Sequence, residues 1–176
     1  MTVKYFRGQD NPYREDIVNL MQKNDDATRP PMSEMVNDWI VEKPLEKDKA
    51  IEKFYEVQAD HVLVEEKDGE MRGFFLLAEN DEYFKQHIPE YWPHLAVGLA
   101  IVKKEHRREG VAHKLMEYTE KEIMPEQEHS NLIWATTHRN EASQGFAEKH
   151  GMKQVAKIED DRRQGLHTLI YAEKIR

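Results

Sequence analysis

The stretch LAVGLAIV, at Leu95–Val102, followed after four residues by RREGVA, at Arg107–Ala112, decides the fold of this 176-residue chain. An uninterrupted apolar run of this length is typical of a buried central strand. Beyond it, small and apolar side chains recur at helical spacing: Val111, Leu115, Thr119 and Ile123. We expect Pro125 to end this helix, because proline cannot continue the hydrogen-bond ladder. A second strand-like run follows at Leu132–Thr137, so the segment predicts a strand–helix–strand unit with a parallel crossover.

Regular elements are predicted on both sides of this unit. A hairpin carries the strongest local signal, because its Asp68-Gly69 turn tolerates positive φ. The other elements are a strand at Val3–Arg7, a helix opening at Asn11–Pro12, a helix through Met35–Ile40 ended by Pro44, a helix at Ala50–Gln58, the hairpin strands His61–Glu66 and Met71–Ala78, a helix at Asn140–His150, and a closing hairpin of Met152–Ile158 with Leu166–Ala172. No repeat or linker divides the chain, so residues 1–176 are predicted to form a single α/β domain with a mixed sheet.

Composition excludes several classes of protein. The chain has no cysteine, which removes disulfides, cysteine nucleophiles and thiolate metal sites, and makes a reducing cytoplasm the expected location. A net charge of −8 argues against general nucleic-acid binding. No apolar run approaches the roughly 20 residues of a membrane-spanning helix, and the first ten residues do not resemble a secretory signal.

The turn Arg107–Ala112 has the features of an anion-binding site. It lies between a strand and a helix, where helix N-terminal amides and the helix dipole favour an anion. Gly110 would let the backbone approach a phosphate, and a local basic cluster would supply counter-charge: Lys103, Lys104, His106, Arg107 and Arg108. The pattern is neither a Walker loop nor a dinucleotide-binding fingerprint. An ordinary strand-to-helix turn with solvated charges would explain the same residues.

The helix at Asn140–His150 is the second informative element. Asn140 is a suitable N-cap, Glu141 suits the first turn, and Gly151 stands where a left-handed C-cap residue belongs. Ala142, Phe146 and His150 share one stripe. A well-capped amphipathic helix without further function would fit these residues equally well.

Together the two elements resemble the GNAT superfamily of acyl-CoA-dependent N-acetyltransferases. Val102 with Arg107–Ala112 is similar to the family's strand-ending valine and its Arg/Gln-x-x-Gly-x-Gly/Ala motif. The later family motif is matched by Asn140, Ser143, Phe146, Ala147, Gly151 and Met152. The resemblance implies a GNAT-like α/β fold: a mixed, mostly antiparallel sheet with a central parallel pair and helices on both faces.

The resemblance also implies how acetyl-CoA, the acyl donor, would be held. Backbone groups of Ala100, Ile101 and Val102 would pair with the pantetheine arm like an added strand. The pyrophosphate would lie on a turn of six residues: Arg107, Arg108, Glu109, Gly110, Val111 and Ala112. Asn140 would bind the pantetheine, Phe146 would pack beside the thioester, and Ser143 and Lys149 would lie near the nucleotide.

One departure from the family pattern concerns the leaving thiolate. The family usually has a tyrosine where this chain has Ala147, and that tyrosine would protonate the thiolate. Tyr171, His138 and Ser143 are the alternative donors. A catalytically weak acyl-CoA-binding sensor or regulatory module is therefore the alternative to an enzyme. A structural or interaction domain with a coincidental turn is a third hypothesis, which the paired motifs disfavour.

The acceptor is expected to be an amine, of a small molecule or of a peptide or protein, that attacks the thioester directly while both substrates are bound. Such an amine needs a base, and Glu79 and His94, at the ends of the segment Glu79–His94, are the predicted catalytic residues. The acidic and aromatic side chains of this segment would suit a cationic amine, although a surface loop anchored by its aromatics would look the same. Trp39 and Tyr55 could line a wall of the acceptor site, or they could be ordinary core residues. No metal is expected, since the histidines lack ligand spacing, and a homodimer through edge strands is compatible with such a domain.

Overall fold

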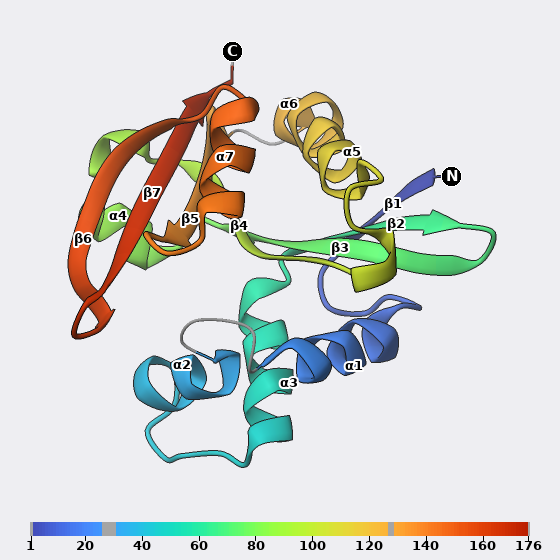
Figure 1. Ribbon diagram of the computed structural model, residues 1–176, viewed down its shortest axis with the longest axis horizontal. Coiled ribbons are helices and arrows are strands. Elements are labelled where there is room, and N and C mark those ends of the chain that lie inside the picture. Colours follow the sequence, from blue (N-terminus) through green and yellow to red (C-terminus); the bar gives the residue numbers. More distant parts are fainter. Residues whose placement is uncertain (1, 26–30, 127–128, 176) are drawn as a thin grey trace. The chain divides into compact units, whose positions relative to one another are not determined.

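The computed structural model describes residues 2–25, 31–126 and 129–175, apart from the side chains of residues 37–39 and 162–163. Seven strands form one sheet in the order β1-β2-β3-β4-β5-β7-β6. β4 and β5 pair in parallel, from His94↔Asn131 to Val97↔Trp134, whereas β1–β2, β2–β3, β5–β7 and β6–β7 pair antiparallel. The predicted mixed, mostly antiparallel α/β sheet with a central parallel pair is thus confirmed (Figure 1).

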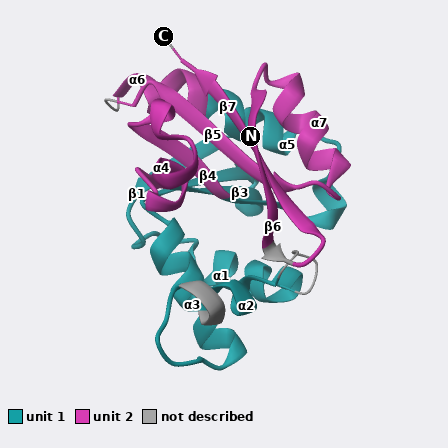
Figure 2. Cartoon of the chain, turned by 90° about the vertical axis from the view of Figure 1, so that its left-hand side faces the viewer, with its two compact units in different colours: residues 1–77, 99–118 teal, residues 78–98, 119–176 magenta. Residues whose placement is uncertain are grey.

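The chain divides into two compact units, residues 1–77 with 99–118, and residues 78–98 with 119–176 (Figure 2). The first holds β1 (Thr2–Arg7), α1 (Arg14–Asn24), α2 (Met32–Trp39), α3 (Lys47–Gln58), β2 (His61–Lys67), most of β3 (Glu70–Glu79), the end of β4 (His94–Val102), η3 (Lys104–His106) and α5 (Val111–Tyr118). The second holds α4 (Glu82–His87), η2 (Pro89–Tyr91), the start of β4, a π-helical turn η4 (Thr119–Ile123), α6 (Met124–Glu126), β5 (Asn131–Thr137), α7 (Glu141–Lys149), β6 (Lys153–Arg163) and β7 (Leu166–Lys174). No helix in the described ranges is long and apolar enough to span a membrane.

In the first unit, helices pack on both faces of the strands. The face toward α1–α3 carries the side chains of Val62, Val64, Phe74 and Leu76, which form one core with Ile17, Met21, Ile51 and Phe54. On the opposite face Gly73 lies against α5, because a Cβ there would be 2.9 Å from Val111 Cγ1 and 2.9 Å from the Ile101 carbonyl oxygen. Gly73 therefore permits the end of β4 and the start of α5 to approach β3 closely.

In the second unit, α4 and α7 cover opposite faces of the strands. Phe84 and Ile88 pack with Ile133 and Ile170 in one apolar cluster. The neighbouring residue on β5, Trp134, points to the other face and contacts Phe146 of α7, with ring centroids 5.0 Å apart. The central strands thus receive apolar cover from both sides, as the sequence predicted.

The local turn signals are confirmed. Asp68 and Gly69 both have positive φ, 53° and 83°, which is the conformation of a two-residue type I′ hairpin turn. The Asn140 side chain caps α7 by accepting a hydrogen bond from the Ser143 amide at 3.2 Å. Gly151 follows this helix with φ 79°, the left-handed conformation that closes many helices.

Two boundary predictions are wrong. Pro125 does not end its helix: α5 runs into the widened π-turn Thr119–Ile123, and the helical chain continues to Glu126. The wider turn accommodates a ring that would collide with a carbonyl of a regular α-helix. Nor does Pro44 end α2, which stops at Trp39, where the amides of the next two residues both donate to the Val36 carbonyl. The joining segment after β3, finally, contains two short helices that were not predicted.

Candidate functional site

The end of β4 presents the backbone predicted to pair with pantetheine. Leu99, Ala100 and Val102 are only half-buried although they belong to a central strand. Leu99 and Ile101 direct their side chains into the α1–α3 core. The strand is fixed on β3 by a hydrogen bond from the Lys103 amide to the Arg72 carbonyl at 2.9 Å. The predicted pantetheine strand is therefore held on one edge and partly accessible.

The turn between β4 and α5 has the backbone of an anion site. Arg108 and Gly110 both adopt left-handed conformations, with φ 69° and 79°, and turns of this kind can form concave nests of amide N–H groups. The first helical hydrogen bond of α5 runs from the Lys114 amide to the Gly110 carbonyl at 3.1 Å. The amides of Val111 and Ala112 therefore precede the ladder and lie at the positive end of the helix dipole. Apart from the two neighbours of Gly110 in the chain, no atom of the described residues lies within 4 Å of a Cβ built on it, so the space beside it is open.

The basic cluster around this turn is only partly available to a ligand. Lys103 Nζ pairs with Glu70 Oε1 at 2.9 Å, and His106 lies between Glu70 and Glu109, 3.6 and 3.7 Å from their carboxylates. The Lys103 ammonium holds the pKa of the Glu70 carboxyl below its usual value, with a smaller contribution from His106. Arg107 Nε donates to the Val102 carbonyl at 3.3 Å. Lys104, Arg107 and Arg108 are the exposed cations of the cluster, and the two arginines belong to the turn itself.

An ion network with two buried members, Arg72 and Glu65, supports the turn from the β3 side. Arg72 Nη2 lies 2.9 Å from Glu109 Oε2, and Arg72 Nε lies 3.3 Å from Glu65 Oε2. Lys114 Nζ lies 3.6 Å from the second Glu65 oxygen. Sequence reasoning missed Glu65 and Arg72. A charged residue facing inward in each strand of an apolar hairpin was the signal that could have revealed them.

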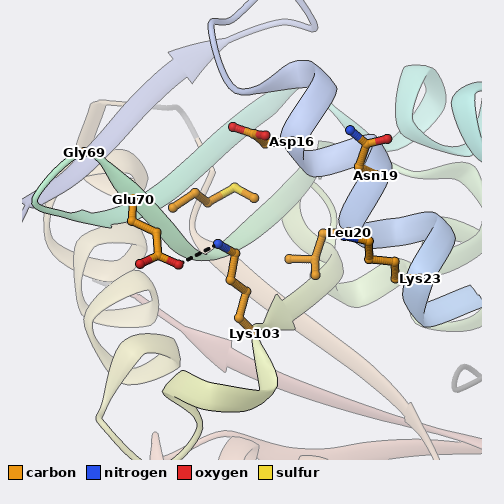
Figure 3. A pocket seen from close by; sticks show the side chains of 8 residues that line it. Asp16, Asn19, Leu20, Lys23, Gly69, Glu70 and Lys103 are labelled. Atoms are coloured by element: carbon orange, nitrogen blue, oxygen red, sulfur yellow. Dashed lines mark hydrogen bonds and ion pairs between the residues drawn. The ribbon is translucent and has the colours of Figure 1, made fainter.

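A cavity of about 350 Å³ lies between α1 and the β2–β3 turn (Figure 3). It is lined from α1 by Asp16, Asn19, Leu20 and Lys23, and from the turn and the end of β4 by Gly69, Glu70, Met71 and Lys103. Among the described residues one group has metal-ligand geometry, Glu70 with Glu105 and His106. Glu70 Oε1 is already paired with the Lys103 ammonium group. The expectation that the protein has no metal stays a prediction.

The residues of the second motif on α7 have defined partners. The Ser143 hydroxyl accepts a hydrogen bond from Trp134 Nε1 at 2.9 Å. Phe146 lies between Trp134 and His150, its ring 5.0 and 4.7 Å from theirs, and Lys149 is exposed at the end of the helix. The cofactor roles of Asn140, Ser143, Phe146 and Lys149 stay predictions.

Ala147, at the family's tyrosine position, is fully buried. Among the alternative proton donors, Tyr171 is also buried, and burial raises the pKa of its hydroxyl. His138 Nδ1 lies 3.1 Å from the amide nitrogen and 3.4 Å from the carbonyl oxygen of His167. Accepting from Trp134 Nε1 leaves the Ser143 hydroxyl its own proton to donate, so His138 and Ser143 both stay candidates.

The two predicted catalytic residues, Glu79 and His94, lie on the neighbouring strands β3 and β4. The Asn80 amide donates to the His94 carbonyl at 3.0 Å, and the His94 amide donates to Asn80 Oδ1 at 3.1 Å, which joins the end of β3 to the start of β4. Glu79 is 29% exposed, and its carboxylate lies 3.9 Å from His129 Nε2. Burial, with a smaller contribution from the neighbouring His129, lowers the pKa of His94 to about 4. Nothing in the sequence around His129 indicated this arrangement.

Aromatic side chains anchor the segment Glu79–His94, and its exposed Trp92 ring makes a cation–π contact with a lysine. Phe84 is buried, and Lys85 Nζ lies 4.5 Å from the centre of the Trp92 ring. Tyr55, considered as a wall of the acceptor site, is a core residue that accepts from Asn11 Nδ2 at 2.7 Å and donates to the Gln9 carbonyl at 2.9 Å. The side chain of Trp39 lies outside the described residues.

Comparison with known proteins places this geometry in context. None of the curated proteins matches the chain by sequence, whereas many solved structures share its fold. The structure of yncA from Salmonella typhimurium with its cofactor acetyl-CoA has a TM-score of 0.70 at 14% identity, covering 100% of this chain and 94% of the other. Ribosomal-protein-alanine N-acetyltransferase from Brucella melitensis (TM-score 0.66, 14% identity, 99% of each chain) and an aminoglycoside 6′-N-acetyltransferase complexed with coenzyme A (0.62, 15%, 100% and 98%) are similar as well.

The sequence itself matches the family described as Acetyltransferase (GNAT) over residues 29–152. The match spans β4, the turn Arg107–Ala112 and α7, so it includes both motifs on which the resemblance rested. The chain therefore belongs to the GNAT acetyltransferase family.

Proposed function

We propose that this protein transfers an acetyl group from acetyl-CoA to an amine by direct attack of the amine on the thioester. The observation that carries the proposal is the turn Arg107–Ala112. It combines the family motif, two left-handed residues and an open space at Gly110. Amides at the start of α5 would bind the pyrophosphate, while Arg107 and Arg108 would add positive charge.

The remaining donor contacts follow the family pattern. We expect the backbone of Ala100–Val102 to pair with pantetheine, since Ala100 and Val102 are partly accessible on a strand that β3 holds in place. Asn140 and Phe146 would contact the pantetheine arm and its thioester, and Ser143 and Lys149 the nucleotide end. Backbone N–H groups of β4 would stabilise the oxyanion that develops as the thioester is attacked.

Proton transfer from the amine is assigned to the cluster at the β3–β4 junction. Glu79 is the more accessible of the two predicted catalytic residues, so we propose it as the base, acting directly or through water. His94 is neutral at pH 7, because its pKa is about 4, and it can accept a proton only weakly. We assign His94 to holding the junction through its backbone bonds with Asn80.

The acceptor is proposed to be an amine of a peptide or of a small molecule. The similar structures include enzymes named for a ribosomal-protein alanine and for an aminoglycoside, so the fold is compatible with peptide and small-molecule amines. Acidic and aromatic side chains of the segment Glu79–His94 would suit a cationic amine of either kind.

A sensor or regulatory module that binds acyl-CoA is the second candidate function. The buried Ala147 favours it, because this position offers no acid to protonate the departing thiolate. A thiolate is a fair leaving group, so loss of a positioned acid need not abolish the reaction, and the enzyme remains our primary proposal.

Calorimetric titration with acetyl-CoA tests the donor site. Gly110→Glu puts a side chain and a negative charge where the pyrophosphate should lie, and it should abolish binding. Gly8→Glu is the matched control, because Gly8 also has positive φ (81°) and open space around its Cβ position. Failure of the wild-type protein to bind acetyl-CoA would refute the proposal. Tight binding without thiol release across a broad amine panel would favour the sensor.

A further inference from the structure

The phosphate-binding turn contains an acid, Glu109, in the middle of a segment expected to attract phosphate. A carboxylate at this place would repel a pyrophosphate unless its charge were neutralised. Glu109 is about half exposed (49%), so burial alone does not keep it away from a ligand. Its neutralisation must come from a neighbouring cation.

Arg72 supplies this cation from the interior of the hairpin. Its side chain is 3% exposed, and Nη2 lies 2.9 Å from Glu109 Oε2. The Arg72 carbonyl accepts the Lys103 amide at 2.9 Å, so the residue is fixed in the ladder that holds the end of β4. Arg72 Nη2 donates a hydrogen bond to Glu109, whereas Nε lies at ion-pair distance from Glu65 without a hydrogen bond to it.

Glu65 holds Arg72 from the other side. Its side chain is fully buried, with Oε2 3.3 Å from Arg72 Nε and Oε1 3.6 Å from Lys114 Nζ. The Lys114 amide makes the first helical bond of α5, to the Gly110 carbonyl. Along the contacts from Glu109 to Arg72, Glu65 and Lys114, acidic and basic side chains alternate, and their formal charges cancel.

We propose that Arg72 is a positioning residue of the coenzyme A site: it holds and neutralises the Glu109 carboxylate, so that this acid does not repel a phosphate bound at the turn Arg107–Ala112. This inference rests on the proposed function. Glu65 sets the guanidinium so that one edge faces the turn. Arg72 does not touch the coenzyme; it acts through Glu109.

The test is a double-mutant cycle read by calorimetric titration with coenzyme A. Arg72→Met should weaken coenzyme A binding on the order of tenfold, as expected for loss of a charge-assisted contact. Glu109→Gln alone should bind coenzyme A at least as tightly as the wild type, because a repulsive charge has gone. The double variant should recover to within about threefold of the wild type, since the charge that Arg72 neutralises is absent.

Recovery by the second substitution separates this role from a purely structural one. If Arg72 only stabilised the core by pairing with Glu65, Glu109→Gln would not restore binding, and that result would overturn the inference. Unchanged affinity in folded Arg72→Met would overturn it as well. If Arg72→Met does not fold, the same cycle is run in a Glu65→Gln background. There the loss of Arg72 leaves no buried carboxylate without its partner. Absence of coenzyme A binding by the wild type would instead refute the proposed function.

Discussion

Replacing Gly73 with alanine tests whether the close approach of β3, β4 and α5 shapes the turn. The new Cβ would lie 2.9 Å from the Ile101 carbonyl oxygen, 2.9 Å from Val111 Cγ1 and 3.2 Å from Val102 Cα. Two of these atoms belong to the backbone of β4, so rotation of one side chain cannot relieve the contact.

The expected loss of stability follows from two opposing terms. Overpacking of this kind costs about 1–3 kcal/mol, whereas replacing glycine by alanine restricts the unfolded chain and offsets about 0.4–1 kcal/mol. We therefore expect the free energy of unfolding to fall by about 1–2 kcal/mol and the thermal midpoint by about 2–8 °C. Because β4 and α5 must move apart, coenzyme A affinity should fall too.

Urea and thermal unfolding followed by circular dichroism measure the stability change, and calorimetry measures the affinity. Gly145→Ala is the matched control: this glycine lies in the exposed face of α7, and a Cβ added there would have no atom within 4 Å. That variant should be more stable by roughly 0.5–1 kcal/mol, because alanine favours helix. A Gly73→Ala protein as stable as the wild type would refute the reasoning from close approach.

The other predictions concern the second unit. Between pH 6.5 and 4 the unfolded chain protonates His94 while the folded protein, with a pKa of about 4, does not, so stability should fall as the pH is lowered; the loss from pH 7 to pH 5 is about 2 kcal/mol. Urea unfolding at both pH values should show a smaller loss in His94→Gln, and an equal loss would contradict this assignment. Ala147→Tyr should destabilise by about 1–3 kcal/mol because Ala147 is fully buried. A tyrosine accommodated with an unchanged thermal midpoint and a large gain in thiol release would show instead that the missing acid limits catalysis.

Features that depend on local backbone chemistry could be predicted from the sequence. The Asp68-Gly69 turn, the Asn140 cap and Gly151 each depend on what one or two residues permit near their own backbone. The central strand and the helix after it followed from apolar periodicity. The family motifs then predicted which residues bind acetyl-CoA, the acyl donor.

Features that depend on contacts between distant residues were missed. Arg72 meets Glu109 across 37 positions, and no pattern along the chain reveals such a pair. His129 reaches Glu79 in the same way, from a loop without a motif. Tyr55 shows the converse: an aromatic residue at helical spacing is compatible with a wall or a core, and only its hydrogen bonds to Asn11 and Gln9 decide.

The lysine on the Trp92 ring has a consequence for substrate selection. Trp92 is the exposed aromatic of its segment, at 38%, and Lys85 lies over its face. A cationic acceptor that used this ring would first displace Lys85, an internal competitor tethered at high local concentration. An exposed cation–π contact is worth about 0.5–1 kcal/mol, which lowers apparent affinity roughly two- to fivefold. Amines with a single point of attachment would therefore be discriminated against in favour of acceptors that make further contacts.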